Sequence, residues 1–216
     1  MKAPTPTTIK EKIEQGNYRA VLYRIVYIGT VEGEYQGKPK RTFKVHLTWE
    51  LSDERKVFKE GDEAKPFVIS QTYSFSMGDM SNLRPIVTGM IGGLTEAEAV
   101  NFDLDTLLGK ACMLQVSHGE SNTGKFKYIL STAQLPKGMQ APDAYNELVL
   151  LSYTDWSDKV FESLPPWIKD EMRKTDEYKT ITGEFDSALS LEEQEQLARA
   201  TKRPENEENP NESIPF

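Results

Sequence analysis

Hydrophobic and polar residues alternate along much of the first two thirds of the chain, which is the pattern of β-strands. In residues 17–29 apolar side chains occupy both alternation sets, as in a strand that is partly buried on each face. Residues 41–51 and 67–75 alternate more strictly, and two further alternating segments cover residues 110–118 and 125–133. The pattern therefore predicts five strands.

The strand at residues 41–51 is expected to have one buried side and one side that faces solvent. Its apolar set consists of Phe43, Val45, Leu47, Trp49 and Leu51, and the polar set consists of Lys40, Thr42, Lys44, His46 and Thr48. Successive side chains of a strand point to opposite faces of the sheet. We therefore expect Phe43 and Trp49 in the core, and His46 beside Lys44 in an exposed groove.

Between the third and fourth strands the period changes to that of a helix. Leu83, Ile86, Val87, Met90, Ile91 and Leu94 recur at helical spacing, with Ser81 or Asn82 at the start and Pro85 in the first turn. A short acidic link follows at residues 95–109. Three strands, a helix and two strands form the element order of the OB-fold, a five-stranded Greek-key barrel that often binds oligonucleotides. We therefore predict a mainly β, OB-fold-like barrel, because ferredoxin-like and small sandwich folds fit this order less well.

Two short helices and an acidic tail are expected after the barrel. Residues 155–164 and 165–174 are predicted to be helical and to pack on the barrel, the second helix showing Trp167, Ile168, Glu171 and Met172 at helical spacing. Apolar content falls from Gly183 onward, which is typical of a flexible segment. The predicted organisation is an N-terminal arm at 1–15, the OB-fold domain at 16–150, a helical extension at 151–182 and the tail at 183–216.

Charge is unevenly distributed along the chain. The 216 residues include 26 basic and 34 acidic side chains, a net charge of -8. Residues 1–150 hold 18 of each sign, so residues 151–216, with 8 basic and 16 acidic side chains, carry the whole excess. This asymmetry indicates a tail that avoids or mimics nucleic acid, attached to a neutral body that is free to have local basic patches.

The composition gives no indication of a membrane protein or a metalloprotein. No apolar run approaches the roughly 20 residues of a membrane span, and the N-terminal residues lack the apolar stretch of a signal peptide, so we expect a cytoplasmic location. Cys112 is the only cysteine, which excludes an internal disulfide. With only His46 and His118 beside it, no repeated Cys/His zinc pattern can form. We expect no metal or other cofactor.

Catalytic motifs are weak. Residues 119–125, GESNTGK, match the first seven positions of a phosphate-binding loop, but Phe126 stands where a Ser or Thr would hold magnesium. The segment also joins two predicted strands, so a hairpin turn explains it better. Cys112 lies within an apolar strand, where cysteine is usually a small buried hydrophobe. We therefore do not expect an enzyme.

Basic and aromatic residues are interleaved on the predicted strands. Single-stranded nucleic acid is bound by cationic grooves that follow the backbone and by aromatic rings on which bases stack. Residues 35–49 contain no acidic side chain, and Glu120 is the only acidic residue in residues 109–138. The candidate nucleic-acid-binding residues are Tyr23, Tyr27, Tyr35, Lys38, Lys40, Arg41, Lys44, His46, Tyr73, Lys125, Phe126, Lys127 and Tyr128.

The chain ends in Ile214, Pro215 and Phe216, preceded by a glutamate-rich segment. This end resembles the C-terminal tip of bacterial single-stranded DNA-binding proteins, in which an acidic tail ends in the same three residues and recruits replication and repair enzymes. Here residues 211–213, Asn-Glu-Ser, replace the aspartates expected before the tip. The resemblance implies that Ile214, Pro215 and Phe216 bind a partner enzyme of replication or recombination.

The body resembles the single-stranded DNA-binding proteins of tailed bacteriophages. The resemblance lies in GNYRAVLYRIVYIG, TYSFSM, SNLR, FDLDTLLGKACMLQVSHGES, LPKGM and LPPWIKDEM, which together span about residues 16–178. It implies an OB-fold protein that binds single-stranded DNA without sequence specificity during phage replication or recombination, in the host cytoplasm, with a homo-oligomer possible. Two alternatives stay open, a protein-interaction hub without DNA binding and a nuclease of the replication module.

Overall fold

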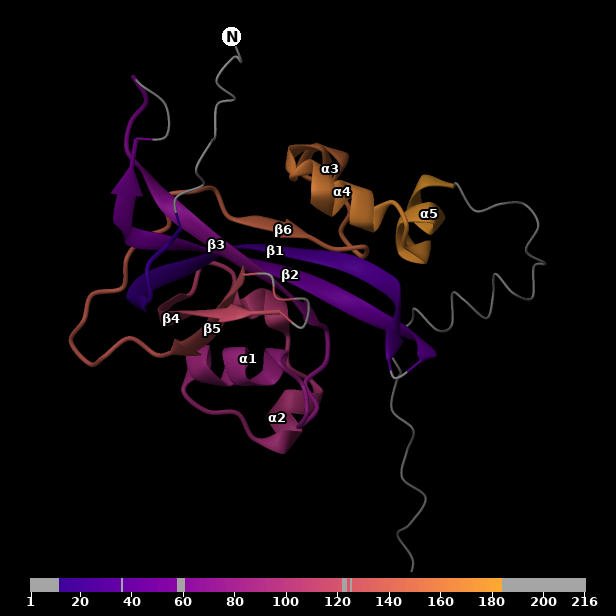
Figure 1. The fold of residues 1–216 in the computed structure, drawn as a ribbon, viewed down its shortest axis with the longest axis horizontal. Coiled ribbons are helices and arrows are strands. Elements are labelled where there is room, and N and C mark those ends of the chain that lie inside the picture. Colours follow the sequence, from indigo (N-terminus) through magenta and orange to yellow (C-terminus); the bar gives the residue numbers. More distant parts are fainter. Residues whose placement is uncertain (1–11, 36, 58–60, 122–123, 125, 184–216) are drawn as a thin grey trace, which may run out of the picture.

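The computed structural model describes residues 12–35, 37–57, 61–121, 124 and 126–183 of the chain. A β-sheet lies between two groups of helices (Figure 1). On one side are α1 (Leu83–Ile91), α2 (Glu96–Val100) and a 3-10 turn at Leu104–Leu107, and on the other are α3 (Asp158–Ser163), α4 (Pro166–Met172) and α5 (Asp176–Thr182). No helix in these ranges is long and apolar enough to cross a bilayer.

The sheet contains the five predicted strands and a sixth that the sequence did not indicate. These are β1 (Gly16–Tyr35), β2 (Lys38–Lys56), β3 (Lys65–Ser74), β4 (Ala111–Glu120), β5 (Phe126–Ala133) and the short β6 (Val149–Leu151). The order is β3-β2-β1-β4-β5 with antiparallel neighbours, and β6 pairs parallel to β1. The mainly β class is confirmed. The expected barrel is not closed, because no pairing joins β3 to β5 in the described part of the chain.

Helix α1 packs against β5 at very short distance. Its buried residues are Leu83, Ile86, Val87 and Met90, the apolar stripe of the sequence pattern. A Cβ on Gly89 would lie 2.1 Å from the carbonyl oxygen of Thr132 on β5, so only glycine allows this approach. The Thr132 hydroxyl donates to the Ile86 carbonyl at 2.6 Å, which fixes the helix on the strand.

The segment after α1, which we expected to be an irregular link, contains helix α2 and the 3-10 turn. Thr95 and Glu98 form a capping box at the start of α2, because the Thr95 hydroxyl accepts from the Glu98 backbone and the Glu98 carboxylate accepts from the Thr95 backbone. The sequence signal was therefore present in TEAE, but the helix is short.

The main core lies between the sheet and α1. Trp49, Leu47 and Leu51 are completely buried there, which confirms the predicted apolar face of β2. Phe43, at the end of this face, is only partly buried and contacts the rings of Tyr27 and Phe75. The inner face of β2 is therefore arranged as its alternation predicts from Val45 to Leu51, whereas Phe43, which we expected in the core, lies at its edge.

The other face of β2 is also buried, so the predicted solvent-facing side is wrong. His46, Thr48 and Glu50 are exposed by only 2%, 1% and 0%. A second apolar cluster covers this outer face of the sheet, and it is formed by Val26, Ile28, Leu151, Phe161, Leu164, Ile168, Met172 and Tyr178. The helices α3 to α5 and β6 therefore convert a polar strand face into an interior surface.

Helix α5 is joined to β1 at a bulge. Gly29 has φ of +101°, and a Cβ there would lie 2.8 Å from a carboxylate oxygen of Glu177, so glycine is required for both reasons. The Glu177 carboxylate accepts from the backbone N–H of Thr30 at 2.9 Å and from its hydroxyl at 2.5 Å. Nearby, the Tyr153 hydroxyl donates to the Ile28 carbonyl at 2.7 Å.

Candidate nucleic-acid interface

Three of the predicted binding residues lie in the interior. Tyr23, Tyr73 and His46 are exposed by 7%, 4% and 2%, so their rings are not available to stack on bases. Tyr73 belongs to the main core, where burial raises the pKa of its hydroxyl. These assignments failed because the sequence does not show which strand faces are covered by other elements.

His46 is a neutral, hydrogen-bonded residue under helix α4. Its Nδ1 lies 2.9 Å from the Thr72 hydroxyl on β3, and its ring meets the edge of the Trp167 ring at 4.9 Å between centroids. Burial, together with the nearby Arg24 guanidinium, lowers the pKa of His46 to about 4. His46 is therefore uncharged at neutral pH and does not line an exposed groove.

Tyr27 is a partly buried structural residue. Its hydroxyl donates to Asp105 Oδ1 at 2.7 Å, which ties β1 to the 3-10 turn. Its ring packs edge-on against Phe75 at 5.3 Å between centroids. These contacts give Tyr27 a role in the fold whatever its role in binding.

The β1–β2 hairpin presents several of the predicted basic side chains. Lys38, Lys40 and Arg41 are exposed, and Lys44 is partly buried. Arg41 forms an ion pair with Asp176 of α5. It therefore also helps to hold helices α3 to α5, which we call the helical layer, against the hairpin. The side chain of Tyr35 lies outside the described residues.

A pocket of about 400 Å³ lies between this hairpin and helices α4 and α5. Its lining carries both signs of charge and includes Glu32, Arg41, Glu171, Lys174, Asp176 and Lys179. Because acids and bases are mixed, the pocket does not form a uniformly cationic groove.

The β4–β5 hairpin carries an aromatic cluster formed by Phe126, which is exposed, and by His118 and Tyr128, which are partly buried. The Phe126 ring lies 5.0 Å from those of His118 and Tyr128, and all three meet edge to face. Phe126 is 40% exposed, and Lys127, the next residue of β5, is exposed on the opposite face of the strand. The predicted Lys125 lies outside the described residues.

The segment before β1 crosses this aromatic cluster. The backbone N–H of Ile13 donates to the Tyr128 hydroxyl at 3.0 Å, and the Ile13 carbonyl lies 2.8 Å from His118 Nε2. Lys12 places its ammonium 4.1 Å from the centre of the Phe126 ring. Aromatic rings and a cation thus meet at one exposed place, which is the combination that single-stranded nucleic acid requires.

Two residues on the outer face were missed by the sequence analysis, Arg24 on β1 and Trp167 on α4. Arg24 is partly exposed, and Trp167 is 49% exposed although its neighbour Ile168 is fully buried. For each residue the sequence contains an indication that the side chain is not part of the core. Arg24 is the only charged residue between Ala20 and Ile28, and Trp167 shares its helix face with Glu171, four residues later.

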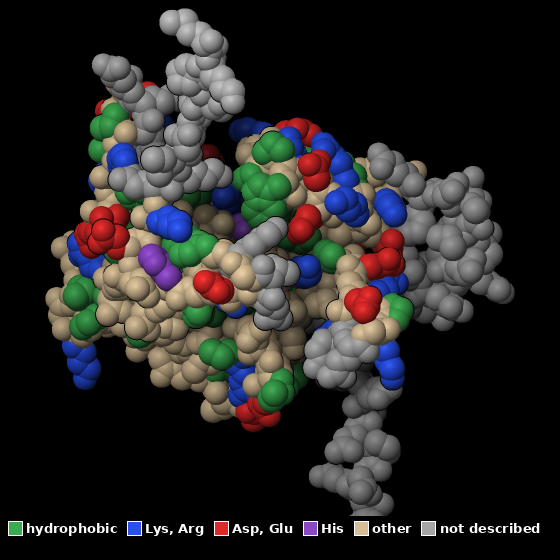
Figure 2. Space-filling view, in the orientation of Figure 1, with side chains coloured by type: hydrophobic (Ala, Val, Ile, Leu, Met, Phe, Trp, Pro, Cys, Tyr) green, Lys and Arg blue, Asp and Glu red, His purple; other side chains and the backbone are tan. Residues whose placement is uncertain are grey.

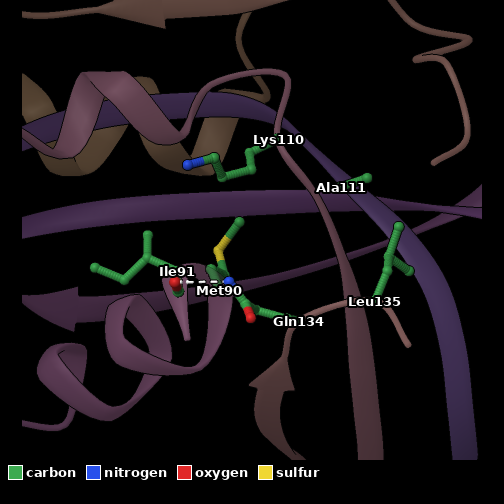
Figure 3. Close-up of a pocket in the computed structure, with 6 residues that line it drawn as sticks. All are labelled: Met90, Ile91, Lys110, Ala111, Gln134 and Leu135. Carbon is green, nitrogen blue, oxygen red and sulfur yellow. Dashed lines mark hydrogen bonds between the residues drawn. The ribbon is translucent and has the colours of Figure 1, made fainter. Parts of the chain in front are cut away.

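Figure 3 shows a second pocket, of about 340 Å³, beside the end of α1. It is lined by Met90, Ile91, Lys110, Ala111, Gln134 and Leu135, and the Gln134 side-chain amide donates to the Ile91 carbonyl at 2.6 Å. Lys110 is the only titratable group in this lining, so the pocket does not offer a pair of groups for acid–base chemistry.

Metal-binding and nucleophilic groups are sparse in the described ranges. They contain no group of three or more His, Cys, Asp or Glu side chains arranged to hold a metal ion. Burial raises the pKa of the Cys112 thiol to about 12, so it is protonated at neutral pH and is a poor nucleophile.

The chain was compared with protein-family models, with curated proteins and with solved structures. None of them matches.

Proposed function

We propose that the protein binds single-stranded DNA with little sequence preference. The observation that carries the proposal is the aromatic cluster on the β4–β5 hairpin, where the partly exposed ring of Phe126 lies 4.1 Å from the Lys12 ammonium. Stacking on a ring is tolerant of sequence because every base has an aromatic face, and the cations balance the phosphates. The chain offers no motif for reading base edges.

The connectivity of the sheet supports an OB-type arrangement. In the OB-fold, which is a partly open five-stranded barrel, oligonucleotides bind across the second and third strands and the two loops that join strands one to two and four to five. Here β1 pairs with both β2 and β4, and β5 follows β4 at the far end. The exposed lysines Lys38 and Lys40 and the aromatic cluster belong to the two corresponding hairpins.

A titration with a fluorescent oligonucleotide at several salt concentrations tests this function. Lys12, Lys38, Lys44 and Lys127 contact no carboxylate among the described residues. If these four meet phosphates, log affinity should fall with log salt at a slope of about -3. Duplex DNA should bind far more weakly, and an RNA oligonucleotide measures the preference between the two nucleic acids.

Three results would contradict the proposal. A protein-interaction hub would show no salt-sensitive binding of the oligonucleotide. A nuclease would shorten the labelled strand when magnesium is added. Equal affinity for duplex DNA would also contradict binding through stacked, unpaired bases.

We further propose that the chain end recruits an enzyme of phage replication or recombination. Ile214, Pro215 and Phe216 lie outside the described residues, so this proposal rests on the resemblance of the sequence alone. Deletion of Phe216 should abolish capture of the host enzyme from an extract and leave DNA affinity unchanged. Capture that survives this deletion would contradict a role for the tip.

A further inference from the structure

Arg24 differs from most arginines of the described chain in having no carboxylate partner. Ion pairs connect Arg19 to Asp53, Arg41 to Asp176, Arg84 to Asp79 and Glu96, and Arg173 to Asp170. Arg24 is partly buried, donates weakly to the Thr48 hydroxyl at 3.4 Å, and lies 5.4 Å from the centre of the Tyr23 ring. No carboxylate contacts it in the described ranges. A partly buried guanidinium that no carboxylate contacts is suited to bind an external anion.

Trp167 lies on the same outer face and leaves half of its ring uncovered. The ring is held edge-on by His46 at 4.9 Å, while the next residue, Ile168, anchors the helix in the second apolar cluster. The ring is therefore positioned by two rigid elements, α4 and β2. A large aromatic side chain that is fixed but 49% exposed is a ready stacking surface.

His46 is the common neighbour of these two residues, because its ring contacts Trp167 and the Arg24 guanidinium lies near enough to affect it. Arg24 is opposite Thr48, and His46 is two residues from Thr48 and therefore on the same face. Thr72 of β3, opposite His46, continues this face toward the sheet edge. Figure 2 shows histidine side chains (purple) on this side of the molecule, one at the surface and one recessed among its neighbours.

We propose that Arg24 and Trp167 form a second contact point for the bound strand, with a base stacked on the Trp167 ring and a phosphate on the Arg24 guanidinium. This inference rests on the proposed function and adds a site from the helical layer to those on the two hairpins. A strand long enough to reach both places would contact the β4–β5 aromatic cluster and α4. His46 supports the ring from below and adds no charge of its own.

Tryptophan fluorescence during titration with oligothymidine tests the site directly. The chain has three tryptophans, of which Trp49 is fully buried and Trp156 is packed against Tyr153 in the second cluster. Quenching by the oligonucleotide should therefore come from Trp167, and Trp167→Phe should remove it while retaining most of the binding. Quenching that persists in Trp167→Phe would overturn the proposal.

Two further variants separate stacking from charge. Trp167→Ala should weaken binding by about 10-fold without changing the salt dependence, because it removes a stacking surface. Arg24→Gln should weaken binding and reduce the salt slope by about 0.7, the value for one lost phosphate contact on a single strand. Lys159→Gln, which removes one exposed cation from α3 in the same helical layer, is the matched control and should leave both quantities unchanged. Melting curves should show that all variants are folded.

The outcomes of these experiments show whether a failure concerns only the site at Arg24 and Trp167 or the proposed function as a whole. Absence of binding by the wild-type protein overturns both. Normal binding by the wild type, with Trp167→Ala and Arg24→Gln equal to Lys159→Gln, overturns only the site. Thymidine monophosphate should bind far more weakly than the oligonucleotide, and equal affinity would overturn the proposal by indicating a site for free nucleotides.

Discussion

The two faces of β2 are buried to the same extent, but one carries apolar side chains and the other carries polar side chains. The inner face presents Leu47, Trp49 and Leu51 to the main core, whereas the outer face carries His46, which contacts α4, Thr48, and Glu50, which contacts the segment before β6. The inner face is stabilised by the burial of apolar area. On the outer face polar groups are buried too, and each needs a partner. Burial alone therefore does not reveal which interaction stabilises a strand.

The largest expected effect is on the inner face. Trp49→Ala should lower the free energy of unfolding by about 3–5 kcal/mol, because it leaves a large cavity in the main core. Denaturant unfolding measures this change. A variant that unfolds like the wild type would mean that Trp49 does not belong to the core.

Glu50 tests the outer face. Its carboxylate accepts from the backbone N–H of Tyr145 at 2.5 Å, the backbone N–H of Asn146 at 2.9 Å and the Asn146 side chain at 2.5 Å. Glu50→Ala should lower the free energy of unfolding by about 2–3 kcal/mol, because these donors lose their acceptor. Glu50→Gln keeps one oxygen and should cost less. Equal losses for Gln and Ala would show that packing matters here more than hydrogen bonds.

His46 makes the outer face sensitive to pH. Burial and Arg24 lower its folded pKa from 6.5 to about 4, so its contribution to stability is fully present above about pH 6.5 and is lost as the pH falls toward 4. Between pH 7 and pH 5 the unfolded state gains protons that the folded state does not, which costs about 2 kcal/mol. His46→Gln should lack this component. Identical pH profiles for the two proteins would contradict a buried neutral histidine.

The smallest expected effect concerns β5, whose two faces also differ. Phe126→Ala should weaken DNA binding by about 1 kcal/mol, at the low end for a stacked base, because Lys12 already lies over the ring. Ile129→Ala, an exposed apolar residue of the opposite alternation set on the same strand, is the control and should bind like the wild type. A larger loss for Ile129→Ala would place the DNA on the other face.

The sequence predicts the strands of this protein well because alternation reports which side chains share a face. It predicts α1 for the same reason, through the apolar stripe that includes Leu83 and Met90. It does not report what covers a face. His46 looked solvent-facing because polar residues usually are, and only the docking of α4 explains its burial.

Alternation shows which side chains share a face but not what covers that face, and this also explains which of the candidate binding residues are exposed. Phe126 and Lys127 are exposed because they belong to a hairpin at the end of the sheet order, where fewer elements cover them. Tyr73 has a similar local sequence pattern but faces the main core. Trp167 was expected to pack on the barrel because its period resembled that of Ile168, and only its position on the helix surface shows that it is exposed.

β1 pairs with both β2 and β6, and this has a consequence for the order in which the chain folds. β1 and β2 pair through a tight hairpin, so their contacts form between neighbouring parts of the sequence, whereas Arg24 of β1 pairs with Val149 of β6 across most of the chain. Contacts between distant residues require the closure of a long loop and form slowly. We expect the β1–β2 hairpin to form early and the helical layer to dock late, on a strand that is already in place. During synthesis, the outer face of β2 would therefore stay uncovered until nearly the whole described chain has emerged.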